Sequence, residues 1–196
     1  MSNEELEHFK IVMLGDTGVG KTALVERLSD DIFSDAHFPT VGAQFVSLVM
    51  TVKDQKMVME LWDTAGQEVF RSLVGFYARD SAGALLLCDV SNQESFDGLA
   101  QWLTFIKENA PDAKIILFAN KIDLADARVI SSQKLQEFAS KNDLTLFEGS
   151  AKTAENVQDA FETICEQVSA KIKPKNNTTT VDVQKEPTQA KKGCCK

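Results

Sequence analysis

Eight residues near the start of the chain, GDTGVGKT, have the composition of a phosphate-binding loop. Gly15, Gly20, Lys21 and Thr22 match the spacing G-x-x-x-x-G-K-[ST]. Glycines let consecutive backbone N–H groups converge on anionic oxygens. A lysine at this spacing can reach β- and γ-phosphate oxygens, and a threonine hydroxyl can bind magnesium. The alternative is an ordinary glycine-rich turn between a strand and a helix, so the flanking elements decide the interpretation.

A second motif, DTAGQ, occupies residues 63–67. An aspartate at the end of a strand, here Asp63, can hold magnesium directly or through water. Gly66 allows its N–H to approach a terminal phosphate, and Gln67 can orient a water molecule. Asp, Thr and Gly are also good turn formers, so a plain turn is the alternative. The phosphate loop upstream favours the functional interpretation.

A third motif, NKID at residues 120–123, indicates which base is bound. Guanine presents two donors along one edge, and the carboxylate of Asp123 is an acceptor-only fork that matches them. Adenine lacks this pattern and would leave the carboxylate unpaired. Asn120 can serve the N7/O6 side of the purine, and the aliphatic part of Lys121 can cover the ring. The stretch SAK at residues 150–152 can place a backbone N–H at O6.

These motifs require a framework of alternating strands and helices. Residues 9–14 read as a buried strand, and residues 21–30 carry apolar residues at helical spacing without proline. We expect further strands at 45–52, 57–63, 82–90, 114–120 and 144–148, of which the first two form a hairpin. We expect further helices at 95–109, 131–141 and 156–171. The first of these helices has candidates for its N-cap within 91–95. This predicts an α/β P-loop NTPase fold. Its mostly parallel six-stranded sheet has one antiparallel hairpin strand and helices on both faces. All the motifs follow strands, where such folds bind ligands.

Composition and charge support one domain with a tail. The chain has 196 residues, 43% of them apolar, and a net charge of −8. From residue 171 onward seven lysines face two acidic residues, which leaves −13 for the rest. An acidic body argues against nucleic acid as a partner. Cys88 and Cys165 lie in apolar segments and are expected to be reduced core residues. We find no signal segment and no apolar run of the length of a membrane span.

The five motifs in order, GDTGVGKT, Thr40, WDTAGQ, NKID and SAK, resemble the Ras-like small GTPases over about residues 8–172. The stretches FPTVGAQF, VMELWDTAGQEVFRSL and YARDSAGALLLCDVS are similar to those of the Rab family. The resemblance implies that Phe33 packs edgewise on guanine and that Thr40 binds magnesium and the γ-phosphate in the GTP state. The nucleotide-binding candidates are Gly15, Asp16, Thr17, Gly18, Val19, Gly20, Lys21, Thr22, Ala23, Phe33, Thr40, Gly66, Asn120, Lys121, Asp123, Ser150, Ala151 and Lys152. The metal candidates are Thr22, Thr40 and Asp63, and the catalytic candidates are Gln67 and Lys21.

The alternation of polar and apolar residues along the two hairpin strands indicates a surface that binds a partner. Phe45 shares a face with small polar residues, and Trp62 shares a face with Glu60, while the apolar residues point the other way. Aromatics on the more polar face are candidates for binding a partner. With Tyr77 they match the effector-binding aromatic triad of Rabs. The alternative is that neighbouring loops cover them.

The resemblance implies a switch that binds GTP or GDP with Mg²⁺ and hydrolyses GTP slowly, because no arginine finger is evident in cis. It implies effectors, an exchange factor, a GTPase-activating protein (GAP), an escort protein and a GDP-dissociation inhibitor as partners of a monomeric domain in vesicle traffic. A metabolic P-loop kinase would need a lid or acceptor domain, for which no segment remains. A non-hydrolysing module is disfavoured because Thr40, Asp63 and Gln67 are retained.

The division expected along the chain is an acidic, flexible N-terminus at 1–7, a GTPase domain at 8–173 and a disordered tail at 174–196. The tail ends Gly193-Cys194-Cys195-Lys196, which does not match C-a-a-X because cysteine is not fourth from the end. Adjacent terminal cysteines resemble Rab tails with two geranylgeranyl groups. A redox-active or merely exposed thiol pair is the alternative. We expect a prenylated protein on the cytoplasmic face of an intracellular membrane that cycles with the cytosol.

Overall fold

In the computed structural model, residues 6–34, 43–52, 54–64 and 71–170 are described, and of residues 71–73 only the backbone. Six strands form one sheet in the order β2-β3-β1-β4-β5-β6. Strand β2 is antiparallel to β3, and the other four neighbouring pairs are parallel. The predicted fold class is therefore confirmed. The strands are β1 (Glu7–Leu14), β2 (Ala43–Val52), β3 (Gln55–Thr64), β4 (Gly83–Asp89), β5 (Lys114–Asn120) and β6 (Thr145–Glu148).

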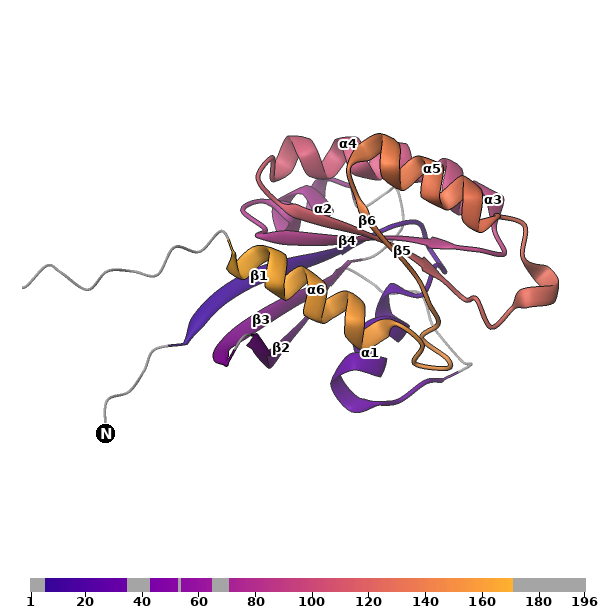
Figure 1. The fold of residues 1–196 in the computed structure, drawn as a ribbon. Coiled ribbons are helices and arrows are strands. Elements are labelled where there is room, and N and C mark those ends of the chain that lie inside the picture. Colours follow the sequence, from indigo (N-terminus) through magenta and orange to yellow (C-terminus); the bar gives the residue numbers. More distant parts are fainter. Residues whose placement is uncertain (1–5, 35–42, 53, 65–70, 171–196) are drawn as a thin grey trace, which may run out of the picture.

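Helices cover both faces of the sheet (Figure 1). The helices are α1 (Lys21–Asp30), α2 (Arg71–Ala78), α3 (Gln93–Asp97), α4 (Leu99–Asn109), α5 (Ser132–Asn142) and α6 (Val157–Ser169), with the short 3-10 helix η2 (Ala125–Ala127). On one face α1 and α6 bury Leu24, Phe161 and Ile164. On the other face, α2, α3, α4 and α5 surround a second core that includes Trp102 and Leu135. Within the described residues, no helix combines the length and apolar character that a bilayer span requires.

The central strands explain why the sheet forms at all. Every residue of β4 is buried, and the last five residues of β5 are buried. A strand covered on both faces is mostly apolar, and both sequences, GALLLCD and KIILFAN, are nearly continuous apolar runs. The parallel register then brings the carboxyl ends of β1, β3, β4 and β5 to the same edge of the sheet.

Most predicted element boundaries are right within two residues, and one predicted helix differs. The helix expected over 95–109 begins earlier, at Gln93, and is interrupted at Gly98 into α3 and α4. The Asn92 side chain caps it by accepting from the Ser95 N–H, inside the expected 91–95 range. Helix α2 was not predicted, because its sequence RSLVGFYA is short and contains Gly75. The residues that it buries, Val74 and Ala78, are four positions apart, which is the spacing of one helix face.

The expected division into 1–7, 8–173 and 174–196 stays a prediction, because residues 1–5 and 171–196 lie outside the described part. Strand β1 begins at Glu7, slightly before the expected start of the domain.

Candidate nucleotide-binding site

The loop between β1 and α1 has the backbone shape that its glycines permit. Gly15, Gly18 and Gly20 have φ angles of 145°, 80° and 98°, in the region that L side chains rarely adopt. At two of these positions space is also limiting. A Cβ on Gly15 would lie 2.5 Å from the carbonyl oxygen of Leu87, and a Cβ on Gly20 would lie 2.3 Å from Asn120 Nδ2. The glycines therefore allow the loop to lie tightly against β4 and β5.

Lys21 lies inside this loop. Its side chain is buried, and its Nζ donates to the carbonyl oxygens of Gly15 and Asp16, each at 2.8 Å. Burial lowers the pKa of Lys21 to about 8, although the nearby carboxylates of Asp63 and Asp16 oppose this change. Because burial outweighs these carboxylates, the ammonium is only partly compensated, which favours binding of an anion here.

Thr22 and Asp63 meet at the start of α1. The Thr22 hydroxyl donates to Asp63 Oδ2 at 2.5 Å. The parallel register pairs Met13 with Asp63, so the end of β3 is held beside the loop that follows β1. Thr64 strengthens this pairing by donating to the Met13 carbonyl at 2.7 Å.

The carboxylate of Asp63 is well suited to a cation. It is buried, and among the described residues its Oδ1 has no hydrogen-bond partner. Burial raises the pKa of Asp63, while the Thr22 hydroxyl and the charge of Lys21 oppose this change. A buried carboxylate oxygen without a partner next to a threonine hydroxyl provides the hard oxygen ligands that magnesium prefers.

Asn120 joins the phosphate loop to the loop after β6. Its Nδ2 donates to the Val19 carbonyl at 2.8 Å, and its Oδ1 accepts from the Ala151 N–H at 3.1 Å. The side chain is buried, so both ends of its amide are satisfied within the protein. Asn120 therefore holds together two segments that are distant in sequence.

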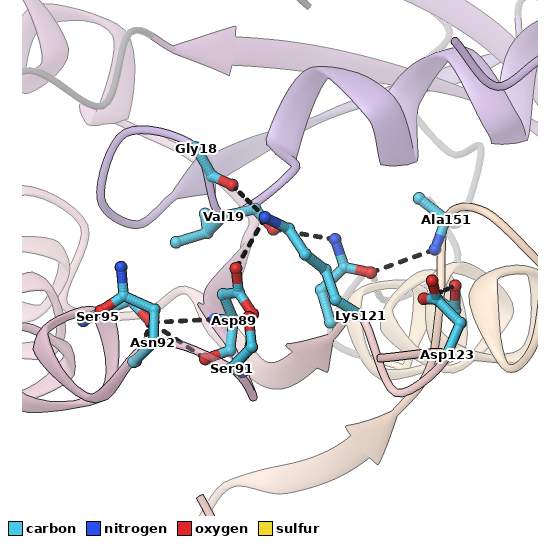
Figure 2. A network of polar contacts seen from close by, with 11 residues as sticks. Gly18, Val19, Asp89, Ser91, Asn92, Ser95, Lys121, Asp123 and Ala151 are labelled. Atoms are coloured by element: carbon cyan, nitrogen blue, oxygen red, sulfur yellow. Dashed lines mark hydrogen bonds and ion pairs between the residues drawn. The ribbon is translucent and has the colours of Figure 1, made fainter. Parts of the chain in front are cut away.

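Lys121 extends across the site, as Figure 2 shows. Its Nζ donates to the Gly18 carbonyl at 2.7 Å and lies 2.6 Å from Asp89 Oδ2. The other oxygen of Asp89 accepts from the N–H and hydroxyl of Ser91. These contacts hold the Lys121 side chain between the phosphate loop and the end of β4, and its predicted role of covering the base stays a prediction. Asp89 was missed, although an acidic residue at the end of a buried parallel strand is a recognisable signal.

The base-recognition candidates also meet. The Ser150 hydroxyl donates to Asp123 Oδ1 at 2.5 Å and accepts from the N–H groups of Lys152 and Thr153. The carboxylate of Asp123 is nevertheless exposed and open to a ligand. Lys152 Nζ lies 5.9 Å from the ring centroid of Phe33, so the loop predicted to reach O6 lies beside the aromatic ring predicted to pack on guanine.

The remaining loop candidates have plain structural positions. Val19 and Ala23 are buried, and Thr17 and Gly18 are exposed. Asp16 accepts a hydrogen bond from Trp102, a residue that the sequence analysis did not connect to the site. Arg27 of α1, also missed, contacts the loop at residues 151–152. The candidates Thr40, Gly66 and Gln67 lie outside the described residues, as do Cys194 and Cys195, so their roles stay predictions.

The three aromatics of the predicted partner surface form one cluster. The ring centroids of Phe45 and Trp62 are 5.2 Å apart, and those of Trp62 and Tyr77 are 4.9 Å apart and stacked. Half of the Phe45 surface is exposed among the described residues, so these residues do not bury it. Phe76, which was not among the predicted residues, packs edgewise on Tyr77 and is 67% exposed. Phe45 and Phe76 give the cluster exposed aromatic surface of the kind found at binding sites, while Trp62 and Tyr77 are half-buried.

Comparison with known proteins agrees with this geometry. The model of the Ras family matches residues 10–170. The Ras-related protein Rab-10 of Caenorhabditis elegans is 34% identical over 192 residues, covering 95% of this chain and 96% of that protein. The Ras-related protein RABF2a of Arabidopsis thaliana is 38% identical over 95% of this chain and 94% of its own. The GTP-binding protein YPT1 of Saccharomyces cerevisiae is 37% identical over 91% of this chain and 88% of its own.

Proposed function

The chain belongs to the Rab family of Ras-like small GTPases, and from this premise we propose that residues 15–23, 63, 120–123 and 150–152 form one site for guanine nucleotide and magnesium. The protein is a GTP-hydrolysing switch in vesicular membrane traffic. The observation that carries the proposed site is Asn120, whose amide connects the phosphate loop to the loop that carries the base-side N–H of Ala151.

The phosphate side of the site is served by the loop and by Lys21. When phosphate oxygens enter, the ammonium of Lys21 exchanges carbonyl partners for anionic ones. Thr22 and Asp63, with Thr40, are the proposed magnesium ligands. Magnesium bound there supplies positive charge against the β- and γ-phosphates.

The base side is served by Asp123, Asn120, Lys121 and Ala151. We propose that the Asp123 carboxylate accepts from the two donors of guanine, with Ser150 holding it in place. Lys121 is proposed to cover the ring, and Phe33 is proposed to pack edgewise on it. This assignment makes recognition depend on a charged fork, which discriminates strongly against bases without the matching donors.

The switch itself is proposed to depend on Thr40, Gly66 and Gln67. Thr40 and Gly66 contact the γ-phosphate in the GTP state, and Gln67 orients the attacking water. Effectors that bind at Phe45, Trp62 and Tyr77 are proposed to bind the GTP state in preference to the GDP state. An exchange factor and a GAP are the proposed regulators, and the GAP supplies transition-state charge worth roughly 10³ to 10⁵ in rate.

Membrane attachment is proposed at Cys194 and Cys195, with an escort protein for prenylation and a GDP-dissociation inhibitor for extraction. Two lipid chains anchor stably, whereas one chain anchors marginally. Lysines 191, 192 and 196 add roughly 1 kcal/mol each near an anionic leaflet. The proposed location is the cytoplasmic face of an intracellular membrane, in exchange with the cytosol.

Single-turnover hydrolysis of GTP tests the proposed function. The wild type should convert bound GTP to GDP slowly without any acceptor substrate. Gln67→Leu should keep GTP affinity and slow this conversion, whereas Gln133→Leu on α5 should change neither. A need for an acceptor would indicate a kinase, and no conversion at all would indicate a binding module. An unchanged intrinsic rate in Gln67→Leu would remove Gln67 from the mechanism.

A further inference from the structure

Arg27 lies near the end of α1, and its guanidinium bridges three segments of the chain. Its Nε donates to the Ala151 carbonyl at 2.8 Å, and its Nη2 donates to the Lys152 carbonyl at 3.1 Å. Its Nη1 donates to the Asp31 carbonyl at 2.9 Å and lies 2.7 Å from Asp31 Oδ1. The Arg27 side chain is 15% exposed, so these contacts are largely shielded from water.

A helix-capping role does not account for this arrangement. Arginine near a helix C-terminus commonly bonds the last carbonyls, and the contacts with Asp31 are of that kind. The contacts with Ala151 and Lys152, however, join residues 124 and 125 positions apart in the chain. They direct half of the guanidinium fork to the loop after β6.

The loop that Arg27 contacts carries the base-side groups. The Ala151 N–H is held by Asn120, and its carbonyl is held by Arg27, so the residue is held from both sides. In the same loop, the Ser150 hydroxyl donates to the Asp123 carboxylate. A shift of this loop would therefore move both the Ala151 N–H and the orientation of Asp123.

The Nη1 group of Arg27, through Asp31, holds the segment that leads to Phe33. Asp31 ends α1 in a left-handed conformation with φ of 55°. Two residues later, the Phe33 ring lies beside Lys152, on the loop that Arg27 also holds. Helix α1 begins with Lys21 and Thr22, so one helix carries phosphate-side residues at one end and Arg27 near the other.

We infer that Arg27 is a positioning residue that holds the base-recognition loop and the Phe33 segment against α1, and thereby slows nucleotide dissociation and sharpens selection for guanine. This inference rests on the proposed nucleotide site. Arg27 touches neither phosphate nor base in it. A lysine cannot replace it, because an ammonium lacks the planar fork that supplies donors in three directions.

The test measures GDP dissociation and base preference on the purified full chain. Arg27→Ala should raise the GDP dissociation rate about tenfold, since shielded hydrogen bonds from a charged group are lost. Arg27→Lys keeps the charge and should raise the rate at least about threefold. Both variants should show a reduced preference for GDP over inosine diphosphate, which lacks the 2-amino group that Asp123 reads. Hydrolysis of bound GTP in a single turnover should change less than dissociation.

Arg128→Ala is the matched control. Arg128 is also a partly buried arginine that pairs with a carboxylate, Glu148, and donates from Nε to a backbone carbonyl, that of Ile130. Glu148 lies two residues before Ser150, but no described contact joins Arg128 to residues 150–153. Dissociation and base preference in this variant should stay within about twofold of wild type, even where stability falls.

The outcomes separate the two proposals. If the wild type does not bind GDP, the proposed function fails. If it binds GDP and Arg27→Lys has wild-type dissociation and base preference, the role of Arg27 fails while the site stands. Arg128→Ala changing both quantities as much as Arg27→Lys would also overturn the inference, because general destabilisation would then explain the effect. If Arg27→Ala does not fold, Arg27→Lys decides alone.

Discussion

The indole N–H of Trp102 donates to Asp16 Oδ1 at 2.8 Å, joining α4 to the phosphate loop across 86 residues of sequence. Gly98, at the start of α4, makes room for this contact, since a Cβ there would lie 2.7 Å from Asp16 Oδ2. The position of the phosphate loop therefore depends on a helix that carries none of the predicted motif residues.

Breaking the contact between Trp102 and Asp16 should destabilise the protein. Asp16→Ala removes the acceptor of this buried hydrogen bond and should lower the free energy of unfolding by about 1–3 kcal/mol. Asp16→Asn keeps a carbonyl acceptor and should cost less. Urea unfolding of the nucleotide-free protein measures both. If both variants lost the same free energy of unfolding, the hydrogen bond from Trp102 would not be the cause of the destabilisation.

Gly98→Ala should act through the same contact, because its methyl group displaces the Asp16 carboxylate. Gly75→Ala in α2 is the control. Its Cβ would lie 3.4 Å from the nearest atom, Asn109 Oδ1, and alanine in a helix stabilises by about 0.4–1 kcal/mol. In urea unfolding, we expect Gly98→Ala to lower the free energy of unfolding and Gly75→Ala to raise it. The same sign in both would contradict the steric argument.

The stability of the nucleotide-free protein should depend on pH through Lys21. Its pKa is lowered from 10.5 to about 8, so between these values the unfolded chain binds more protons than the native protein. Stability then rises with pH from about 8 to 10.5, by no more than about 3 kcal/mol.

Unfolding of the wild type and of Lys21→Met across this range measures the effect. The wild type should gain stability relative to the variant, which has no titrating group at this position. Bound GDP should abolish the gain in the wild type, because phosphate oxygens near Nζ favour the charged form. If the difference in unfolding free energy between the two nucleotide-free proteins did not change with pH, the titration could not be assigned to Lys21.

Asp123→Asn should change the preferred base. The amide offers a donor in place of one acceptor, which mismatches guanine and matches the 2-oxo group of xanthine. GTP affinity should fall roughly 10- to 100-fold, and xanthosine triphosphate should compete better. Competition binding measures this preference. Asp126→Asn, on an exposed residue of η2, should keep the wild-type preference, and Asp123→Asn doing so as well would exclude Asp123 as the base reader.

Removing the terminal thiols should release the protein from membranes. With both Cys194 and Cys195 changed to serine, no lipid can be attached there, so the protein should move to the soluble fraction without losing GTP binding. Each single variant keeps one possible chain and should bind membranes weakly and reversibly. Sedimentation of cell lysates separates the two fractions. Sedimentation of the double variant with membranes would place the anchor elsewhere.

The sequence alone determined the fold class and most of the proposed site. Near-continuous apolar runs such as that within 114–120 indicate central parallel strands, because both faces of such strands are covered. The phosphate loop could be predicted from its spacing, since glycines at 15, 18 and 20 and the following helix act locally. Lys21, Thr22, Asp63, Asn120 and Asp123 were predicted because each lies in a short motif next to a strand end.

Tertiary structure alone decided how these motifs are held together. Trp102, Asp89 and Arg27 lie outside the predicted motifs, and their partners are 86, 32 and 124 residues away in the chain. Such pairings follow from strand register and helix packing, which bring distant backbone carbonyls and carboxylates within hydrogen-bonding distance. Local spacing contains no information about which distant residues meet, so these pairings became visible only in the folded chain.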